Sequence, residues 1–277
     1  MKNENQTILP RNIAIILAGG SGHRMGGDLP KQFLPLGGKT VLERAVDAFE
    51  KNRNIHEIAI VCAPEWREKV EAIAAQSHWH KLKKILPGGK ERYHSSLSAI
   101  KAYQDSGANL IFHDAARPLV SQEIINNVCT ALLQHQAVDV ALPCTDTILQ
   151  IKDGFIESVP DRNRLMRSQT PQAFRVEVIA QAYKNARKDK NFSTTDDCGV
   201  VRKYLPMIPI SIVQGDEYNM KLTHKQDLKI LQNIAKSQRK KKKTEIYSKT
   251  SFFRVNRKAL NNQFGRGLLA LNRFRFR

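Results

Sequence analysis

The stretch NIAIILAGGSGHRM at residues 12–25 joins a run of apolar, mostly β-branched residues to a loop of small residues. A short apolar run bounded by glycines is typical of a strand that is buried on both faces. The glycines at 19, 20 and 22 are followed by Arg24, and Lys31 comes seven residues after that arginine. We therefore expect a buried strand over 12–20 that ends in a glycine-rich turn close to two cations.

Strand-like and helix-like patterns alternate along the chain after this stretch. The sequence predicts strands over 57–64, 83–89, 109–118, 138–151 and 209–216, helices over 40–52, 65–77, 95–106, 121–136, 176–187 and 225–236, and regular structure over 198–205. Ser121 stands where a helix N-cap is expected. This alternation predicts an α/β fold: a Rossmann-like three-layer α/β/α arrangement around a mostly parallel sheet.

The alternation stops between about 145 and 175. Asp153-Gly154 is a turn dipeptide between two apolar runs, which indicates a β-hairpin. The residues that follow it, SVPDRNRLMRSQTPQAF at 158–174, are polar and carry several arginines. We expect this segment to form an arm that projects from the sheet.

Charge divides the chain of 277 residues into two parts. The formal net charge is +19, but residues 236–277 hold 14 of the 45 Lys and Arg residues and a single acid, Glu245. Residues 1–235 are therefore only mildly basic, as expected of an enzyme that handles anions. We predict one catalytic domain over 1–235 and a disordered, basic tail over 236–277.

Composition excludes several other classes of protein. The apolar fraction of 41% is that of a globular chain. The four cysteines show no CxxC spacing, which argues against a zinc site or a disulfide scaffold and fits a reducing compartment. The N-terminal residues lack the apolar segment of a signal peptide, and no apolar run approaches the roughly 20 residues of a membrane helix. We expect a cytoplasmic protein with no membrane partner.

The glycine-rich loop does not match the common phosphate-binding motifs. A dinucleotide-type GxGxxG would need glycine where Met25 stands, and Gly38-Lys39-Thr40 fails as a Walker A motif because Phe33 replaces its first glycine. Free backbone amides beside Arg24 and Lys31 would still suit a triphosphate. An ordinary tight turn with solvated cations remains the alternative.

Polar residues gather where the predicted strands end. The 17–25 loop, Gly88-Gly89 and HDAARP at 113–118 each follow a strand, and ligands of parallel sheets bind at that edge. Asp114 could hold Mg²⁺ against phosphate oxygens, although it could instead serve as a loop carboxylate. We interpret His113 as a packed, hydrogen-bonded residue rather than a catalyst.

Seven ordered segments carry a resemblance to a known family. These are LAGGSGHRM…PKQF, GGKERYHS, HDAARP, TDT, VPDRNRL…QTPQAF, TTDD and NMKLT, and the likeness covers roughly residues 11–235. In order and spacing they resemble the 2-C-methyl-D-erythritol 4-phosphate cytidylyltransferases, which belong to the wider polyol-phosphate cytidylyltransferases. The resemblance implies a nucleotidyltransferase fold, use of Mg²⁺, and transfer of CMP from CTP to 2-C-methyl-D-erythritol 4-phosphate with release of diphosphate.

The resemblance also implies roles for individual residues. Arg24 and Lys31 would be catalytic, and Asp114 would bind the metal. The nucleotide would contact Ala18, Gly19, Gly20, Ser21, Gly22, Gly89, Ser95, Asp114 and Ala115. The polyol phosphate would contact Thr147, Arg162, Thr170 and Lys221. The arm over 145–175 would join two chains into a homodimer and carry its substrate-binding residues to the partner's site.

Two groups of residues bear on the identity of the acceptor. LAGG at 17–20 and Tyr218 resemble the ribitol-5-phosphate cytidylyltransferases, which would make CDP-ribitol. Glu91-Arg92 and Thr195-Asp196-Asp197 resemble the methylerythritol branch, which we favour.

The tail has no counterpart in the family pattern. Its lysines and arginines with interleaved phenylalanines could contact nucleic acid or another anionic surface, or could form an extension with no dedicated role. A third reading, an RNA-binding protein on an inactive transferase fold, is opposed by the complete set Arg24, Lys31, Asp114, Arg162 and Lys221.

Overall fold

The computed structural model describes residues 9–20 and 29–238. Ser21, Gly22, Arg24 and the tail over 239–277 lie outside the described residues. The chain divides into two units, Met1–Leu231 and Gln232–Arg277. The fold and the candidate site both belong to the first unit, and the domain boundary expected near 235 stays a prediction.

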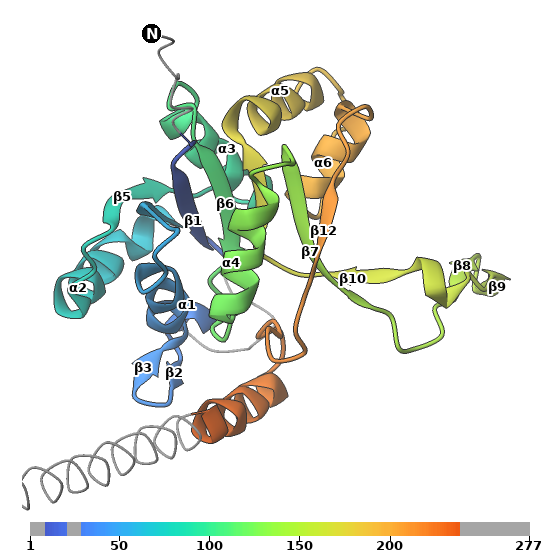
Figure 1. The fold of residues 1–277 in the computed structure, drawn as a ribbon. Coiled ribbons are helices and arrows are strands. Elements are labelled where there is room, and N and C mark those ends of the chain that lie inside the picture. Colours follow the sequence, from blue (N-terminus) through green and yellow to red (C-terminus); the bar gives the residue numbers. More distant parts are fainter. Residues whose placement is uncertain (1–8, 21–28, 239–277) are drawn as a thin grey trace, which may run out of the picture. The chain divides into compact units, whose positions relative to one another are not determined.

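A mixed sheet forms the centre of this unit (Figure 1). Its strands among the described residues are β1 (Asn12–Ala18), β4 (Glu57–Cys62), β5 (Leu82–Pro87), β6 (Asn109–Asp114), β7 (Ala137–Pro143), β10 (Met166–Ser168), β11 (Gln172–Arg175) and β12 (Ser211–Gln214). The order is β10-β7-β11-β6-β1-β4-β5, and β12 pairs with β7. Strands β6, β1, β4 and β5 are parallel neighbours, and they carry the ends at which the site forms.

Helices cover both faces of the sheet (Figure 1). They are α1 (Val41–Glu50), α2 (Arg67–Ser77), α3 (Arg92–Tyr103), α4 (Gln122–Ala131), α5 (Val176–Ala186) and α6 (Asp197–Tyr204). Residues 225–238 are also helical. Helices α1, α2 and α4 pack on one face, and α3, α5 and α6 pack on the other. The predicted three-layer α/β/α architecture is confirmed.

Strand β1 shows why its sequence is apolar at every position. Ala14 and Ile16 contact the core beneath α1, α2 and α4, while Ile13 and Ile15 contact the core beneath α3 and α5. Because successive side chains of a strand point to opposite faces, a strand covered on both sides must be apolar throughout. The continuous apolar run of β1 therefore lies inside the sheet, covered by helices on both faces.

Side-chain caps set two helix starts. The Thr40 hydroxyl accepts a hydrogen bond from the Glu43 amide, and the Glu43 carboxylate accepts one from the Thr40 amide, which forms a capping box. The Ser121 hydroxyl accepts from the Ile124 amide, so the expected N-cap is confirmed. Helix α3 begins at Arg92, three residues before the predicted start, because Glu91 and His94 form the cap there.

The continuous strand predicted over 138–151 is wrong. Strand β7 ends at Pro143, which has no amide hydrogen to donate to a ladder. The chain then leaves the sheet, and β8 (Gln150–Lys152) pairs only with β9 (Phe155–Ser158). Strands β10 and β11 were also missed: both belong to the central sheet, although they lie in the segment over 145–175 that we expected to project from it as an arm. Strand β10 lies antiparallel to β7, and β11 lies antiparallel between β6 and β7.

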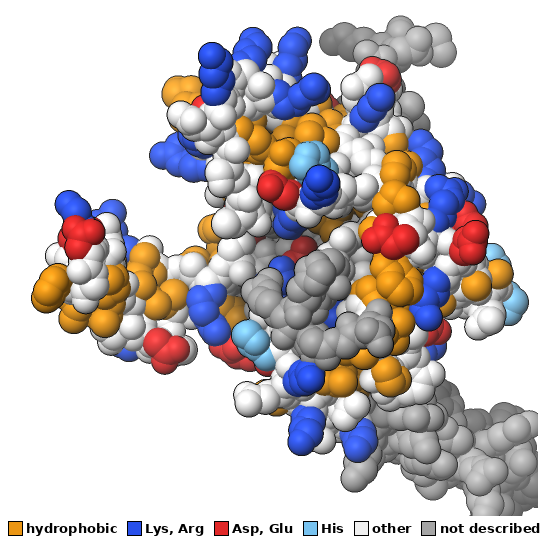
Figure 2. Space-filling view, turned by 180° about the vertical axis from the view of Figure 1, so that it is seen from behind, with side chains coloured by type: hydrophobic (Ala, Val, Ile, Leu, Met, Phe, Trp, Pro, Cys, Tyr) orange, Lys and Arg blue, Asp and Glu red, His pale blue; other side chains and the backbone are white. Residues whose placement is uncertain are grey.

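Strands β8 and β9 form the predicted hairpin (Figure 1). Asp153 and Gly154 connect them with φ values of 50° and 84°, as a type I′ turn requires. Ile151, Phe155 and Ile156 on this hairpin are exposed, and Figure 2 shows apolar side chains gathered on this projection at the left of the view. The arm therefore presents an uncovered apolar surface.

Three short 3₁₀ segments and one small hairpin complete the described elements. They are η2 (Lys31–Phe33), η3 (Pro64–Trp66), η4 (Arg162–Arg164), and the pair β2 (Pro35–Leu36) and β3 (Lys39–Thr40). Within the described residues, none of the helices combines the length and apolar character that a membrane crossing needs.

Candidate active site

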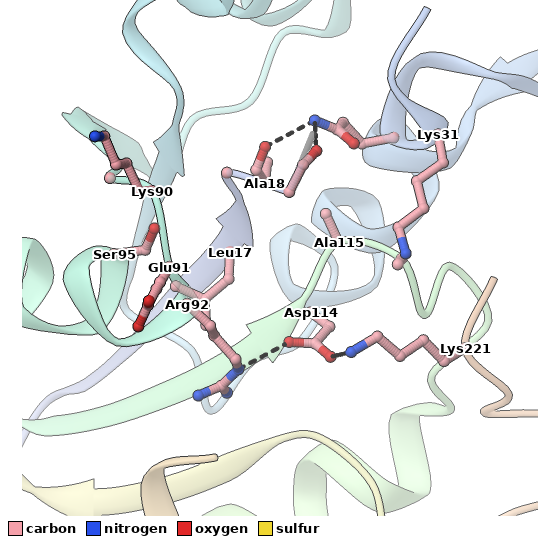
Figure 3. A pocket seen from close by; sticks show the side chains of 15 residues that line it. Leu17, Ala18, Lys31, Lys90, Glu91, Arg92, Ser95, Asp114, Ala115 and Lys221 are labelled. Atoms are coloured by element: carbon pink, nitrogen blue, oxygen red, sulfur yellow. Dashed lines mark hydrogen bonds and ion pairs between the residues drawn. The ribbon is translucent and has the colours of Figure 1, made fainter. Parts of the chain in front are cut away.

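A pocket of about 220 Å³ lies at the carboxyl ends of β1, β5 and β6. Three loops meet there, as the sequence predicts: the one after β1, the one after β5 and the one after β6. Its lining is formed by Leu17, Ala18, Gly19, Gly20, Lys31, Gln32, Gly89, Lys90, Glu91, Arg92, Ser95, Asp114, Ala115, Ala116 and Lys221. Figure 3 shows Lys31 and Lys221 on one side of the pocket and Ser95 and Glu91 on the other.

The structure brings together most of the described residues that the sequence singles out. The pocket contains Ala18, Gly19, Gly20, Lys31, Gly89, Ser95, Asp114, Ala115 and Lys221. Thr170 does not line it, but its hydroxyl accepts a hydrogen bond from the Asp114 amide at 3.1 Å. Thr147 and Arg162 lie in the arm segment and do not line it either. Ser21, Gly22 and Arg24 lie outside the described residues.

Glycines allow the loops after β1 and β5 to approach helix α3. A Cβ atom on Gly19 would lie 2.9 Å from the Ser95 Oγ, and one on Gly89 would lie 2.5 Å from the His94 Cβ. Neither glycine is required for a positive φ, so the close approach itself explains them. The result is a floor on which backbone and the Ser95 hydroxyl face the pocket.

Gln32 fixes the other side of the loop after β1. Its buried side-chain amide donates to the Ala18 oxygen at 2.8 Å and to the Gly20 oxygen at 3.2 Å. In Figure 3, the dashed lines next to Ala18 mark these bonds. With these carbonyl groups occupied, the small-residue loop is held in one conformation up to Gly20.

Asp114 is the carboxylate of the pocket, at the end of β6. Its Oδ2 lies 2.7 Å from the Lys221 Nζ, and its Oδ1 lies 3.5 Å from the Arg92 Nε. Burial alone would raise the pKa of Asp114, but the charges of Arg92 and Lys221 outweigh burial and hold this pKa well below its usual range. The group is therefore an anion at any pH at which the protein would work.

Lys31 enters the pocket from the short helix η2. Its Nζ donates to the Leu222 oxygen at 2.9 Å, which ties the start of the chain to a loop 191 residues later. Lys221, the neighbour of Leu222, belongs to that same loop. The ammonium groups of Lys31 and Lys221 thus reach one pocket from distant segments of the chain.

Arg92 and Asp197 are site residues whose importance the sequence did not reveal. The Arg92 Nη1 donates to the Asp197 Oδ2 at 2.6 Å, and Asp197 is fully buried. The two residues are 105 positions apart, so no spacing rule could pair them. Sequence reasoning used both only as markers of one family branch.

His113 is packed and hydrogen-bonded, as predicted. Its Nε2 is 2.9 Å from the Arg117 oxygen and its Nδ1 is 3.1 Å from the Thr170 Oγ1. Complete burial lowers the pKa of His113 to about 4. The imidazole is therefore neutral, and it supports the Asp114 strand rather than facing the pocket.

Arg162 is held within the arm segment. Its Nη1 donates to the Thr145 oxygen at 2.9 Å, and the residue is exposed. Arg162 does not line the described pocket of its own chain.

Comparisons with known proteins agree with this geometry. The family model described as 2-C-methyl-D-erythritol 4-phosphate cytidylyltransferase matches residues 12–237. A protein of that name from Thermobifida fusca (strain YX) is 43% identical over 235 residues, which cover 82% of this chain and 94% of the relative. The crystal structure of 4-diphosphocytidyl-2C-methyl-D-erythritol synthase from Anaerococcus prevotii DSM 20548 has a TM-score of 0.73 at 26% identity and covers 82% of this chain and 99% of its own.

A relative with a different product is also similar. The bifunctional ribulose 5-phosphate reductase/CDP-ribitol pyrophosphorylase of Haemophilus influenzae is 42% identical over 231 residues, which cover 82% of this chain but only 48% of the relative. The family model spans nearly the whole described part of the chain. This chain belongs to the 2-C-methyl-D-erythritol 4-phosphate cytidylyltransferase family.

Proposed function

We propose that this chain transfers CMP from CTP to 2-C-methyl-D-erythritol 4-phosphate, giving CDP-methylerythritol and diphosphate. The observation that carries the proposal is the shared pocket of Lys31, Ser95, Asp114 and Lys221, closed by a glycine floor. Two cations and free backbone surface suit a triphosphate, and family membership supplies the substrates.

The reaction needs positioning and charge neutralisation rather than a covalent intermediate. An oxygen of the acceptor's phosphate attacks the α-phosphorus of CTP, and the bond from that phosphorus to the bridging α,β-oxygen breaks. The electron pair leaves with diphosphate. Lys31 would stabilise the negative charge that develops on the α-phosphate. Arg24 lies outside the described residues, and the family pattern alone assigns it a role beside Lys31.

Mg²⁺ fits the donor set of this pocket. The ion is usually held by one or two carboxylates together with substrate phosphates, and Asp114 is a permanently ionised carboxylate in the nucleotide pocket. Among the described residues, no group of three His, Cys, Asp or Glu side chains is placed to hold a metal. When bound, Mg²⁺ would neutralise phosphate charge and help diphosphate to leave.

The acceptor needs a second cationic subsite. Lys221 provides one cation at the rim of the pocket, but Arg162 and Thr147 lie in the arm segment. The exposed apolar residues of the arm, Ile151, Phe155 and Ile156, would be buried by a second chain. We therefore place Arg162 and Thr147 in the partner's site of a homodimer, with Thr170 supporting Asp114 from below.

The compartment follows from the substrates and the thiols. All four cysteines, Cys62, Cys129, Cys144 and Cys198, are unpaired. Free thiols and a nucleoside triphosphate substrate support a cytoplasmic location.

An acceptor-specific assay tests the proposed function. Purified protein is incubated with CTP, Mg²⁺ and either 2-C-methyl-D-erythritol 4-phosphate or ribitol 5-phosphate, and diphosphate release is measured. We expect kcat/KM to be at least about tenfold higher with the methylerythritol acceptor, since polar groups of a site reject an analogue that leaves them unpaired. Ribitol 5-phosphate is the second candidate because of the relative that makes CDP-ribitol. A preference for ribitol 5-phosphate would overturn our choice of acceptor.

A further inference from the structure

The Asp114 carboxylate lies between two cations that are held in different ways. Figure 3 shows Lys221 on one side of it and Arg92 on the other. The Lys221 side chain is 38% exposed, and its flexible stem allows the ammonium to move to another anion. The Arg92 side chain is 23% exposed and is held at a second point.

That second point is Asp197, at the first turn of α6. The Asp197 Oδ2 accepts from the Arg92 Nη1 at 2.6 Å, and its Oδ1 accepts from the Tyr183 hydroxyl at 2.6 Å. The Asp197 amide also donates to the Gln172 Oε1 at 3.0 Å. Both carboxylate oxygens and the backbone of Asp197 are thus occupied in the interior, so this anchor cannot move without breaking buried bonds.

The planar guanidinium explains why an arginine is present. Its Nη1 faces Asp197 while its Nε faces Asp114, and one rigid fork spans both carboxylates. The ammonium of a lysine has three donors on one nitrogen, so it lacks the separate Nε and Nη1 donors with which the arginine meets the two carboxylates at fixed positions. Asp197 partly offsets the charge of Arg92, and it also fixes the direction from which the guanidinium meets Asp114.

We propose that Arg92 is a positioning residue: anchored on Asp197, it holds the Asp114 carboxylate in its working orientation. Lys221, which has no such anchor, is then the cation that can move from this carboxylate to a substrate. The proposal rests on the proposed function, because it assigns the work to Asp114 in the nucleotide pocket. Its consequence is that loss of Arg92 or of its anchor impairs the chemical step more than it impairs CTP binding.

Kinetics of Arg92→Lys, Asp197→Asn and the double variant test this. We expect kcat to fall about 10- to 100-fold in each single variant while KM for CTP changes less than about threefold, since an interaction important mainly in the transition state is lost. The kcat of the double variant should lie within about twofold of the kcat of Arg92→Lys, because the two residues act as one unit. Independent, multiplying losses, or a raised KM with unchanged kcat, would overturn the proposal.

Two control variants separate positioning from stability and from charge. Val128→Ala creates a cavity in α4 and should lower the melting temperature while kcat stays within about twofold. Arg67→Lys alters an exposed ion pair with Glu71 and should change neither quantity. If kcat fell only in step with melting temperature across all variants, Arg92 would be merely structural.

Crystal structures of wild-type protein and Arg92→Lys supply a readout that does not depend on activity. We expect the Asp114 side chain to leave its wild-type rotamer in the variant while the β6 backbone stays in place. An unchanged Asp114 would overturn the proposal. If wild-type protein released no diphosphate with either acceptor, the proposed function would fail, and the Asp114 rotamer would still decide the role of Arg92.

Discussion

Ser95 lies against two glycines, and the two contacts differ in a way that can be tested. Among the described residues, a Cβ on Gly19 would meet only the Ser95 Oγ, at 2.9 Å. A Cβ on Gly88 would meet the same oxygen at 3.1 Å and also the backbone oxygen of Cys62 at 3.2 Å. Removing the Ser95 hydroxyl therefore makes room at Gly19 but not at Gly88.

We predict that Gly19→Ala raises KM for CTP about tenfold, because the pocket floor must shift by a few tenths of an ångström. In the Ser95→Ala background the same change should cost less than about twofold, since the contact is gone. Gly88→Ala should stay harmful in that background, because the Cys62 oxygen cannot yield. CTP titrations on the five variants measure this. Equal costs at Gly19 with and without Ser95 would contradict the assigned contact.

Asp139 on β7 is a buried acid whose titration should be visible in stability. Its carboxylate accepts from the Gln172 Nε2 and the Ser168 Oγ, both at 3.1 Å. Burial outweighs these bonds and raises the pKa of Asp139 to about 6. Between pH 4 and 6 the folded protein keeps a proton that the unfolded chain has lost, so this group's contribution to stability falls as the pH rises through that window.

We predict that Asp139→Asn gains about 2 kcal/mol of unfolding free energy relative to wild type between pH 4.5 and pH 7, because the amide cannot ionise. Urea unfolding at both pH values measures the difference. Asp189→Asn is the control: Asp189 is partly exposed and hydrogen bonding from Tyr204 lowers its pKa to about 2, so its effect should hardly change over this range. A pH-independent difference at Asp139 would show that it ionises normally.

The strands that could be predicted from sequence are those whose own residues show a clear pattern. β1 is apolar at every position because both faces are covered, and the Asp153-Gly154 turn needs two positive φ values that its residues readily adopt. Strand β11, only Gln172–Arg175, is fixed by its neighbours β6 and β7 instead. Such pairing is non-local, so a four-residue segment after Pro171 gave no signal of it.

The helices show the same division. Thr40 and Ser121 cap α1 and α4 with bonds to residues three positions on, which the sequence displays. The start of α3 was misplaced because the Glu91 cap uses His94 rather than the usual Glu or Gln at that position. Local chemistry thus predicts helix starts only where it follows common patterns.

Across the whole chain, the site was predictable to the extent that topology fixes it. Ligands of parallel sheets bind at the carboxyl ends of strands, and that rule brings Gly19, Gly89 and Asp114 to one pocket. No such rule joins Arg92 to Asp197, because their bond depends on how α3 and α6 each pack against α5. The topology of one chain also does not bring Arg162 to this pocket, since Arg162 donates to the Thr145 oxygen within the arm segment.

The position of Arg162 leads to a prediction about two chains. If each arm completes the partner's site, Arg162→Ala and Lys31→Ala damage the two sites of a mixed dimer unequally. Both defects fall in one site, and the other site keeps Lys31 from one chain and Arg162 from its partner. If Arg162 served its own chain, each site of the mixed dimer would carry one defect.

We therefore predict that the two variants are each nearly inactive alone and regain about a quarter of wild-type activity when dissociated and reassociated in equal amounts, since half of the dimers are mixed and each has one intact site. Diphosphate release measures the recovery. Phe155→Lys in both chains is the control: a charge on the exposed apolar arm should abolish recovery by preventing association. Recovery in that control, or none without it, would contradict a site shared through the arm.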